Sequence, residues 1–131
     1  MTDISTSSSP TGGVVPAGRA GLVFHGTGPD PGTWLPNVLR AASNAAEDLG
    51  AGTDIHVVIQ GPGVALLVPG HAAADQLEAL LRRGVKVLAC GNSLRSVGLE
   101  ATGLTAGVGT VPAAVGYLAR LQWAGWAYIR L

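Results

Sequence analysis

The chain has 131 residues, of which 47% are hydrophobic and 12% charged, and its eight basic and eight acidic side chains give zero formal net charge. This length and apolar content predict a single domain with a sizeable core and exclude a disordered chain. A neutral chain lacks the basic field on which sequence-independent nucleic-acid binding depends, so the composition argues against nucleic acid as a partner.

The sequence also limits the compartment and the cofactors. No apolar run approaches the roughly 20 residues of a membrane span, and the start MTDISTSSSPTGG lacks the basic and apolar regions of a secretory signal. We therefore expect a cytoplasmic protein with no membrane segment. The only cysteine excludes an intrachain disulfide and a thiolate zinc cage, and nothing else resembles a metal cluster, so we expect no metal and no organic cofactor.

The first part of the chain predicts a tail, a strand, a helix and a second strand. Residues 1–18 are rich in Ser, Thr, Gly and Pro and are expected to form a flexible tail before a single domain at 19–131. The apolar run at 20–25 predicts the first strand. Helical spacing predicts a helix over 33–49, with Pro36 in its first turn. Residues 54–60 have the continuous β-branched character of a strand buried on both faces.

The second half continues this alternation. We expect a single helical turn at 64–68, a helix at 71–84, a strand at 85–90, a short helix after it, a strand at 108–111, a helix at 112–125 and a strand at 126–130. The apolar face predicted for the last helix consists of Val115, Leu118, Ala119 and Trp123.

Strands that alternate with helices predict an α/β fold, with helices on both faces of a mainly parallel five-stranded sheet. We expect the flavodoxin-like strand order, in which the first strand lies between the second and the third. Ligands of such sheets bind at the carboxyl ends of the strands. His25, Gln60, Cys90 and Thr110 stand where strands end, so these side chains are expected to converge on one edge of the sheet.

Cys90 is the strongest functional candidate. It ends a strand directly before a predicted helix, whose free N–H groups favour a thiolate over a thiol. Gly91 lets the backbone come close, Asn92 or Ser93 can cap the helix, and Arg95 can add positive charge or hold an anion. These features predict a partly exposed, reactive thiol. The alternative is that Cys90 is only a small buried hydrophobe, as free cysteines often are.

The other candidates have structural alternatives. His25 can act as a base or hydrogen-bond partner near the thiol, although a single histidine after a strand is more often structural. His56 and His71 are interpreted as structural residues. The Gly-Pro-Gly sequence at 61–63 is interpreted as a tight turn, because no nucleotide-binding glycine motif follows a strand.

Three segments together resemble the DsrE/DsrF-like family of sulfur-relay proteins: IHVVIQGPGVALLV, LRRGVKVLACGNSLRSVGL and VGTVPAAVGYLARLQWAGWAYIRL. The resemblance covers roughly residues 19–131. It implies a YchN-like three-layer fold, a homotrimer or homohexamer with the cysteine loop near subunit contacts, and sulfur carried as a persulfide. By this resemblance Cys90 is the sulfur-carrying residue, with Gly91 and Asn92 as its motif neighbours. A small, nearly uncharged surface rich in Ala, Val, Leu and Gly independently favours a homo-oligomer.

Three hypotheses of function follow. The first is a sulfur-relay protein that carries a persulfide on Cys90 and exchanges sulfur with donor and acceptor proteins. The second is an oligomeric module that binds a small molecule or an anion, in which Cys90 only lines a pocket beside His25 and Gln60. The third is an oligomeric structural protein without chemistry.

Overall fold

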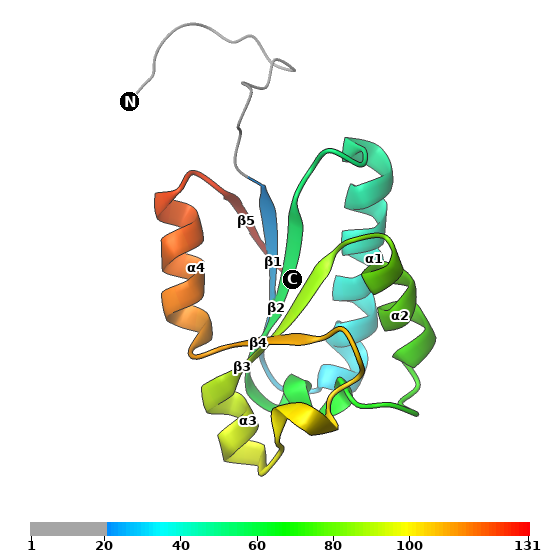
Figure 1. Ribbon diagram of the computed structural model, residues 1–131, viewed down its shortest axis with the longest axis vertical. Coiled ribbons are helices and arrows are strands. Elements are labelled where there is room, and N and C mark those ends of the chain that lie inside the picture. The colour runs from blue at the N-terminus through cyan, green and yellow to red at the C-terminus, as the bar shows by residue number, and fades with distance from the viewer. Residues whose placement is uncertain (1–20) are drawn as a thin grey trace, which may run out of the picture.

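The computed structural model describes residues 21–131, which form a parallel sheet between two layers of helices (Figure 1). The strands are β1 (Leu22–Gly26), β2 (Ile55–Ile59), β3 (Lys86–Cys90), β4 (Gly109–Val111) and β5 (Ala127–Arg130). The helices are α1 (Pro31–Leu49), α2 (Ala74–Arg82), α3 (Gly91–Val97) and α4 (Ala114–Trp123), with short 3₁₀ helices η1 (Gly61–Leu66) and η2 (Ala101–Gly103). The α/β class and all five strands are as predicted. The tail expected at residues 1–18 lies outside the described residues.

The strand order differs from the flavodoxin-like order that we expected. The sheet runs β4-β3-β2-β1-β5, so β1 lies between β2 and β5. The chain steps in one direction from β1 to β4, and right-handed crossovers then place α1 and α2 on the same face. Only the last connection returns across the sheet, and the same handedness puts α4 on the opposite face (Figure 1). Connections leave toward opposite faces after β3 and after β4, which makes the gap between these strands the switch point of the sheet.

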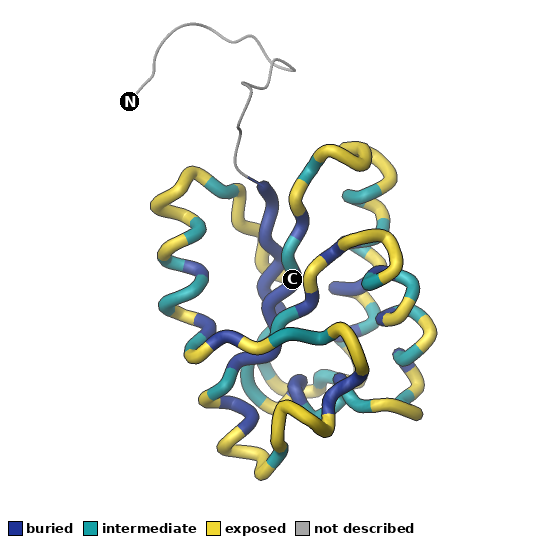
Figure 2. The backbone as a smooth tube through the Cα atoms, in the orientation of Figure 1, coloured by how far each residue is buried: buried dark blue, intermediate teal, exposed yellow. Residues whose placement is uncertain are grey.

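Each face of the sheet has its own apolar core. The larger core packs α1 and α2 against one face, and its buried side chains include Leu35, Leu39, Leu77 and Leu80. The smaller core lies under α4 and consists of Val23, Val58, Cys90, Ala114 and Leu118. Figure 2 shows the buried central strands between these two layers. Cys90 therefore belongs to the packing of the α4 layer.

Two helices differ from the sequence prediction. Helix α1 begins at Pro31, so Pro36 lies in its second turn instead of its first. Pro31 takes the first helical position, where the missing N–H of proline costs nothing. In α4, Leu118 is buried as expected, but Val115 is 67% exposed and Trp123 is 82% exposed. The buried stripe of α4 begins at Ala114, and the helical spacing alone fits either stripe.

Strand β5 lies at the edge of the sheet, beside β1, and all four of its residues are exposed. Tyr128 and Ile129 on this strand are exposed large apolar side chains, as are Val115 and Trp123 on α4. The helical turn predicted at 64–68 overlaps η1, which starts three residues earlier, at Gly61, and ends at Leu66. Within residues 21–131, none of the helices has the length and apolarity of a membrane span.

Candidate functional site

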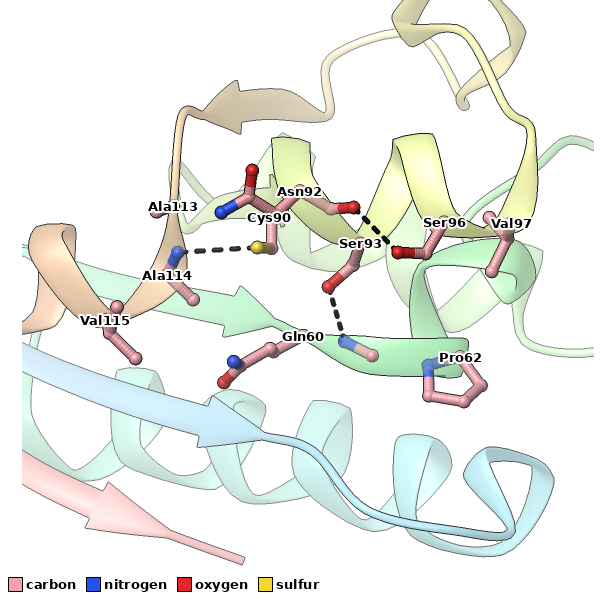
Figure 3. A pocket seen from close by; sticks show the side chains of 11 residues that line it. Gln60, Pro62, Cys90, Asn92, Ser93, Ser96, Val97, Ala113, Ala114 and Val115 are labelled. Carbon is pink, nitrogen blue, oxygen red and sulfur yellow. Dashed lines mark hydrogen bonds between the residues drawn. The ribbon is translucent and has the colours of Figure 1, made fainter.

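The site is a pocket at the carboxyl ends of β2 and β3, next to the switch point of the sheet (Figure 3). Cys90 is the last residue of β3, and Gln60 directly follows β2. The pocket has a volume of about 220 Å³. Its lining consists of Gln60, Gly61, Pro62, Cys90, Asn92, Ser93, Ser96, Val97, Ala113, Ala114 and Val115. Among the residues that the structure describes, no charged side chain lines this pocket.

Hydrogen-bond donors surround the sulfur of Cys90. The Ala114 amide donates to Sγ at 3.4 Å, as the dashed line in Figure 3 shows. The Ser93 hydroxyl and the amides of Ser93 and Asn92 also donate toward the sulfur. Ser93 Oγ accepts a hydrogen bond of 2.7 Å from the Gly61 amide, which leaves its proton free to point at Cys90. The thiol is therefore held in a ring of donors that favours its anionic form.

The pKa of the Cys90 thiol is lowered from its ordinary value. Burial alone would raise this pKa, but the hydrogen bonds from Ser93, Ala114 and Asn92 together outweigh burial. The thiolate fraction at neutral pH is therefore larger than for a free cysteine.

The expectation of a partly exposed thiol was wrong. Cys90 is only 2% exposed, because the connection from β4 to α4 brings Ala113 and Ala114 over the sulfur. The sulfur faces the pocket rather than open solvent, so a reactant must enter the pocket to meet it.

Gly91 permits this close approach. A Cβ atom at Gly91 would lie 3.0 Å from the carbonyl oxygen of Val111 and 3.1 Å from that of Pro112. Both contacts are with backbone, which cannot turn aside as a side chain can. The glycine therefore lets the connection before α4 pack closely enough to place the Ala114 amide on the sulfur.

The structure does not bring Arg95 to the thiol. Its guanidinium donates to Oδ1 of Asn92, and its side chain lines a neighbouring cavity together with Glu100 and Thr110. Asn92 does line the cysteine pocket, but its side chain does not cap α3. Thr110, expected at the same edge of the sheet, also lies in the neighbouring cavity.

His25 reaches the pocket only through Gln60. It is 8% exposed, and its Nε2 atom lies 2.8 Å from Oε1 of Gln60. Its Nδ1 atom lies 2.6 Å from the hydroxyl of Tyr128 on β5. Burial lowers the pKa of His25, the Gln60 hydrogen bond raises it less, and the charge of Arg130 lowers it further. At neutral pH, His25 is therefore a neutral hydrogen-bonding residue.

The other two histidines have structural partners, as predicted. His56 lies 2.6 Å from the Tyr117 hydroxyl and packs on Trp126 under α4. Burial lowers the pKa of His56, and the charge of Lys86 lowers it further against the opposing charge of Asp54. His71 accepts a hydrogen bond from the Ala73 amide just before α2. Within residues 21–131, no cluster of His, Cys, Asp and Glu could hold a metal ion.

Sequence reasoning missed three contributors to the site. Ser93 was considered only as a helix cap, Ala114 acts through its backbone amide, and Tyr128 is an edge-strand residue far along the chain. Of these three, only Ser93 could have been identified from the sequence, because it is a hydroxyl residue three positions after the cysteine.

The chain shares its sequence pattern and its fold with known proteins. The model of the DsrE/DsrF-like family matches residues 20–131. The chain is similar to the protein of unknown function MTH1491 from Methanobacterium thermoautotrophicum, with 32% identity, a TM-score of 0.79 and coverage of 86% of this chain and 100% of that chain. It is similar in fold to the ychN protein from E. coli, with 21% identity, a TM-score of 0.71 and coverage of 86% and 100%. It is likewise similar in fold to the protein of unknown function BT1422 from Bacteroides thetaiotaomicron, with 17% identity, a TM-score of 0.66 and coverage of 84% and 93%. No curated protein matches the chain.

Proposed function

The chain belongs to the DsrE/DsrF-like family, and from this premise we propose that it is a sulfur carrier. Cys90 takes up one sulfur atom as a persulfide and passes it to a thiol of a partner protein in the cytoplasm. The observation that supports this most strongly is the ring of donors around a lone cysteine in a pocket, from Ser93, Asn92 and Ala114. A purely structural cysteine gains nothing from donors that stabilise its anion.

The chemistry needs no redox partner. The Cys90 thiolate attacks the outer sulfur of a donor persulfide, R–S–SH. A bond forms between Sγ and that sulfur, the S–S bond of the donor breaks, and the electron pair leaves with R–S⁻. The product is Cys90–S–SH, whose outer sulfur becomes negatively charged when it loses its proton to solvent. An acceptor thiolate then attacks the same outer sulfur, takes it as R′–S–SH and restores the Cys90 thiolate.

The pocket favours a persulfide over an oxyanion such as thiosulfate. Its polar groups are uncharged, and it offers neutral side chains and backbone amides to the reactant. The doubly charged thiosulfate ion normally requires a cation or a bidentate arginine to offset its desolvation. Arg95, the nearest candidate from the sequence, lies in the neighbouring cavity.

We also propose that the protein works as a homo-oligomer through the exposed apolar surface of α4 and β5. Val115, Trp123, Tyr128, Ile129 and Leu131 make up this α4–β5 surface, and each is at least 37% exposed. Large apolar side chains left in water favour association with a second copy of the chain. An edge strand is also a ready template for association.

The second candidate is a binding module, which the burial of Cys90 favours. In this hypothesis the pocket of about 220 Å³ holds a small neutral or anionic ligand, and the cysteine only contributes to its wall. Iodoacetamide labelling distinguishes the two. A carrier is labelled rapidly between about pH 6 and 7, whereas an ordinary buried thiol is labelled only above about pH 8.5.

Cyanolysis tests the carrier directly. The protein is incubated with glutathione persulfide, freed of the reagent and treated with cyanide, which removes sulfane sulfur as thiocyanate. We expect one thiocyanate per chain from the wild type and none from Cys90→Ser. Equal yields from both proteins would refute the carrier function.

A further inference from the structure

Three side chains form a hydrogen-bonded line from the edge of the sheet to the pocket. Tyr128 on β5 contacts His25 on β1 at 2.6 Å, and His25 contacts Gln60 after β2 at 2.8 Å. Gln60 lines the cysteine pocket, whereas His25 and Tyr128 do not. The line therefore connects a residue of the exposed strand to the wall that faces Cys90.

The direction of these hydrogen bonds is fixed by chemistry. The Oε1 atom of Gln60 can only accept, so Nε2 of His25 must carry its proton and donate. In neutral His25, Nδ1 is then the acceptor and must receive the Tyr128 hydroxyl proton. The Tyr128 hydroxyl thus gives the second hydrogen bond to the tautomer of His25 that carries its proton on Nε2, and that tautomer holds Oε1 of the Gln60 amide.

This orientation turns a donor toward the pocket that holds Cys90. With Oε1 held by His25, the Nε2 amide group of Gln60 is on the pocket side, and Figure 3 shows its oxygen turned away toward β1. Within the described residues, Nε2 of Gln60 has no hydrogen-bond partner. A free amide donor in the same pocket as Cys90, where no charged side chain of the described residues competes, is placed to bind an anion.

We propose that Gln60 binds the negatively charged outer sulfur in the Cys90 pocket through its Nε2 donors, and that His25 and Tyr128 are positioning residues that hold this amide in place. The identity of the anion as a persulfide sulfur rests on the proposed function, but the presence of the Gln60 donor in the Cys90 pocket does not. Without the Tyr128 hydroxyl, Nδ1 of His25 loses its donor, and the tautomer that holds Oε1 of Gln60 is less favoured. The Gln60 amide then turns over and presents its oxygen, which repels an anion.

The test compares two alkylating reagents of similar shape. Iodoacetate carries a carboxylate and iodoacetamide a neutral amide, and both react with the single cysteine. Their ratio of rate constants at Cys90 reports an anion-binding donor beside the sulfur and does not depend on sulfur transfer. Sulfur uptake from glutathione persulfide is measured in parallel, and thermal unfolding checks that each variant folds.

Each variant has a matched control. We expect Tyr128→Phe to lower the iodoacetate-to-iodoacetamide ratio about threefold, through the loss of one neutral hydrogen bond. Tyr117→Phe removes the same kind of hydroxyl, bonded to His56 at 2.6 Å, and leaves the ratio unchanged. We expect Gln60→Glu to lower the ratio about tenfold or more, because it replaces the donor with a negative charge. Gln122→Glu adds the same charge at an exposed site on α4 and has no such effect.

Gln60→Met is the neutral variant to use if Gln60→Glu fails to fold, and it too lowers the ratio. The assignment is overturned if neither Gln60 variant lowers the ratio, and the positioning role is overturned if Tyr128→Phe and Tyr117→Phe behave alike. If the wild type takes up no sulfur while these ratios still change as expected, the carrier function fails and the anion-binding role of Gln60 stands.

Discussion

Ser93→Ala should make Cys90 a weaker nucleophile at neutral pH. In the wild type, the Ser93 hydroxyl donates to the sulfur, and its oxygen accepts the Gly61 amide at 2.7 Å. A hydrogen bond to a charged group contributes about 1.5 kcal/mol or more. Its loss raises the pKa of the Cys90 thiol, because the thiolate loses more stabilisation than the thiol does. About 1.4 kcal/mol corresponds to a tenfold change, so the thiolate fraction at neutral pH should fall about tenfold.

The assay is the rate of iodoacetamide labelling across a pH series, followed by intact mass. We expect Ser93→Ala to move the rise in rate to higher pH and to leave the rate at high pH nearly unchanged. Ser96→Ala is the matched control, since Ser96 also lines the pocket but its hydroxyl donates to the Asn92 carbonyl at 3.2 Å. A profile for Ser93→Ala that superimposes on the wild type, or an equal shift for Ser96→Ala, would refute the donor ring as the cause of the low pKa.

Three further predictions concern packing, pH and assembly. Gly91→Ala should lower the unfolding temperature and slow the labelling of Cys90 at neutral pH, because the added Cβ would lie 3.0 Å from a backbone oxygen. Gly32→Ala is the control and should have neither effect, since a Cβ at Gly32 meets nothing within 4 Å. Burial lowers the pKa of His25 and His56 below the value in the unfolded chain, so the unfolded state binds more protons. The unfolding temperature should therefore fall as the pH drops below about 6.5. An equally steep fall of the unfolding temperature with pH in a variant with both histidines replaced by glutamine would contradict this. Trp123→Glu places a charge on a side chain that is 82% exposed and should reduce the mass measured by light scattering at micromolar concentration, while a wild type that is already monomeric would rule out the oligomer.

The sequence was sufficient for the fold class because its local patterns are strong. Buried β-branched runs such as 54–60 and helix stops such as Gly50 and Gly84 mark elements independently of their neighbours in space. The strand order was not predictable in the same way. The one long return from β4 to β5 carries α4 across the sheet, and no local pattern encodes how far a crossover travels.

The candidate site was likewise predictable only where residues adjacent in the sequence form it. Cys90 and Gly91 were identified because they stand next to each other at the end of a strand. The groups that determine the pKa of Cys90 are brought in by tertiary structure: Ala114 lies 24 residues along the chain, and Ser93 is held by Gly61 from 32 residues away. Arg95 was chosen from helical spacing, but its guanidinium pairs with Asn92 instead.

The most direct measurement is the mass of the protein after exposure to a persulfide. The wild type is incubated with glutathione persulfide, separated from the reagent and analysed by intact and peptide mass spectrometry without reductant. A sulfur carrier gains the mass of one sulfur atom, located on the peptide that contains Cys90, and loses it when a reduced thiol is added. A wild-type protein that folds, is labelled by iodoacetamide at Cys90 and still gains no sulfur would contradict the carrier function.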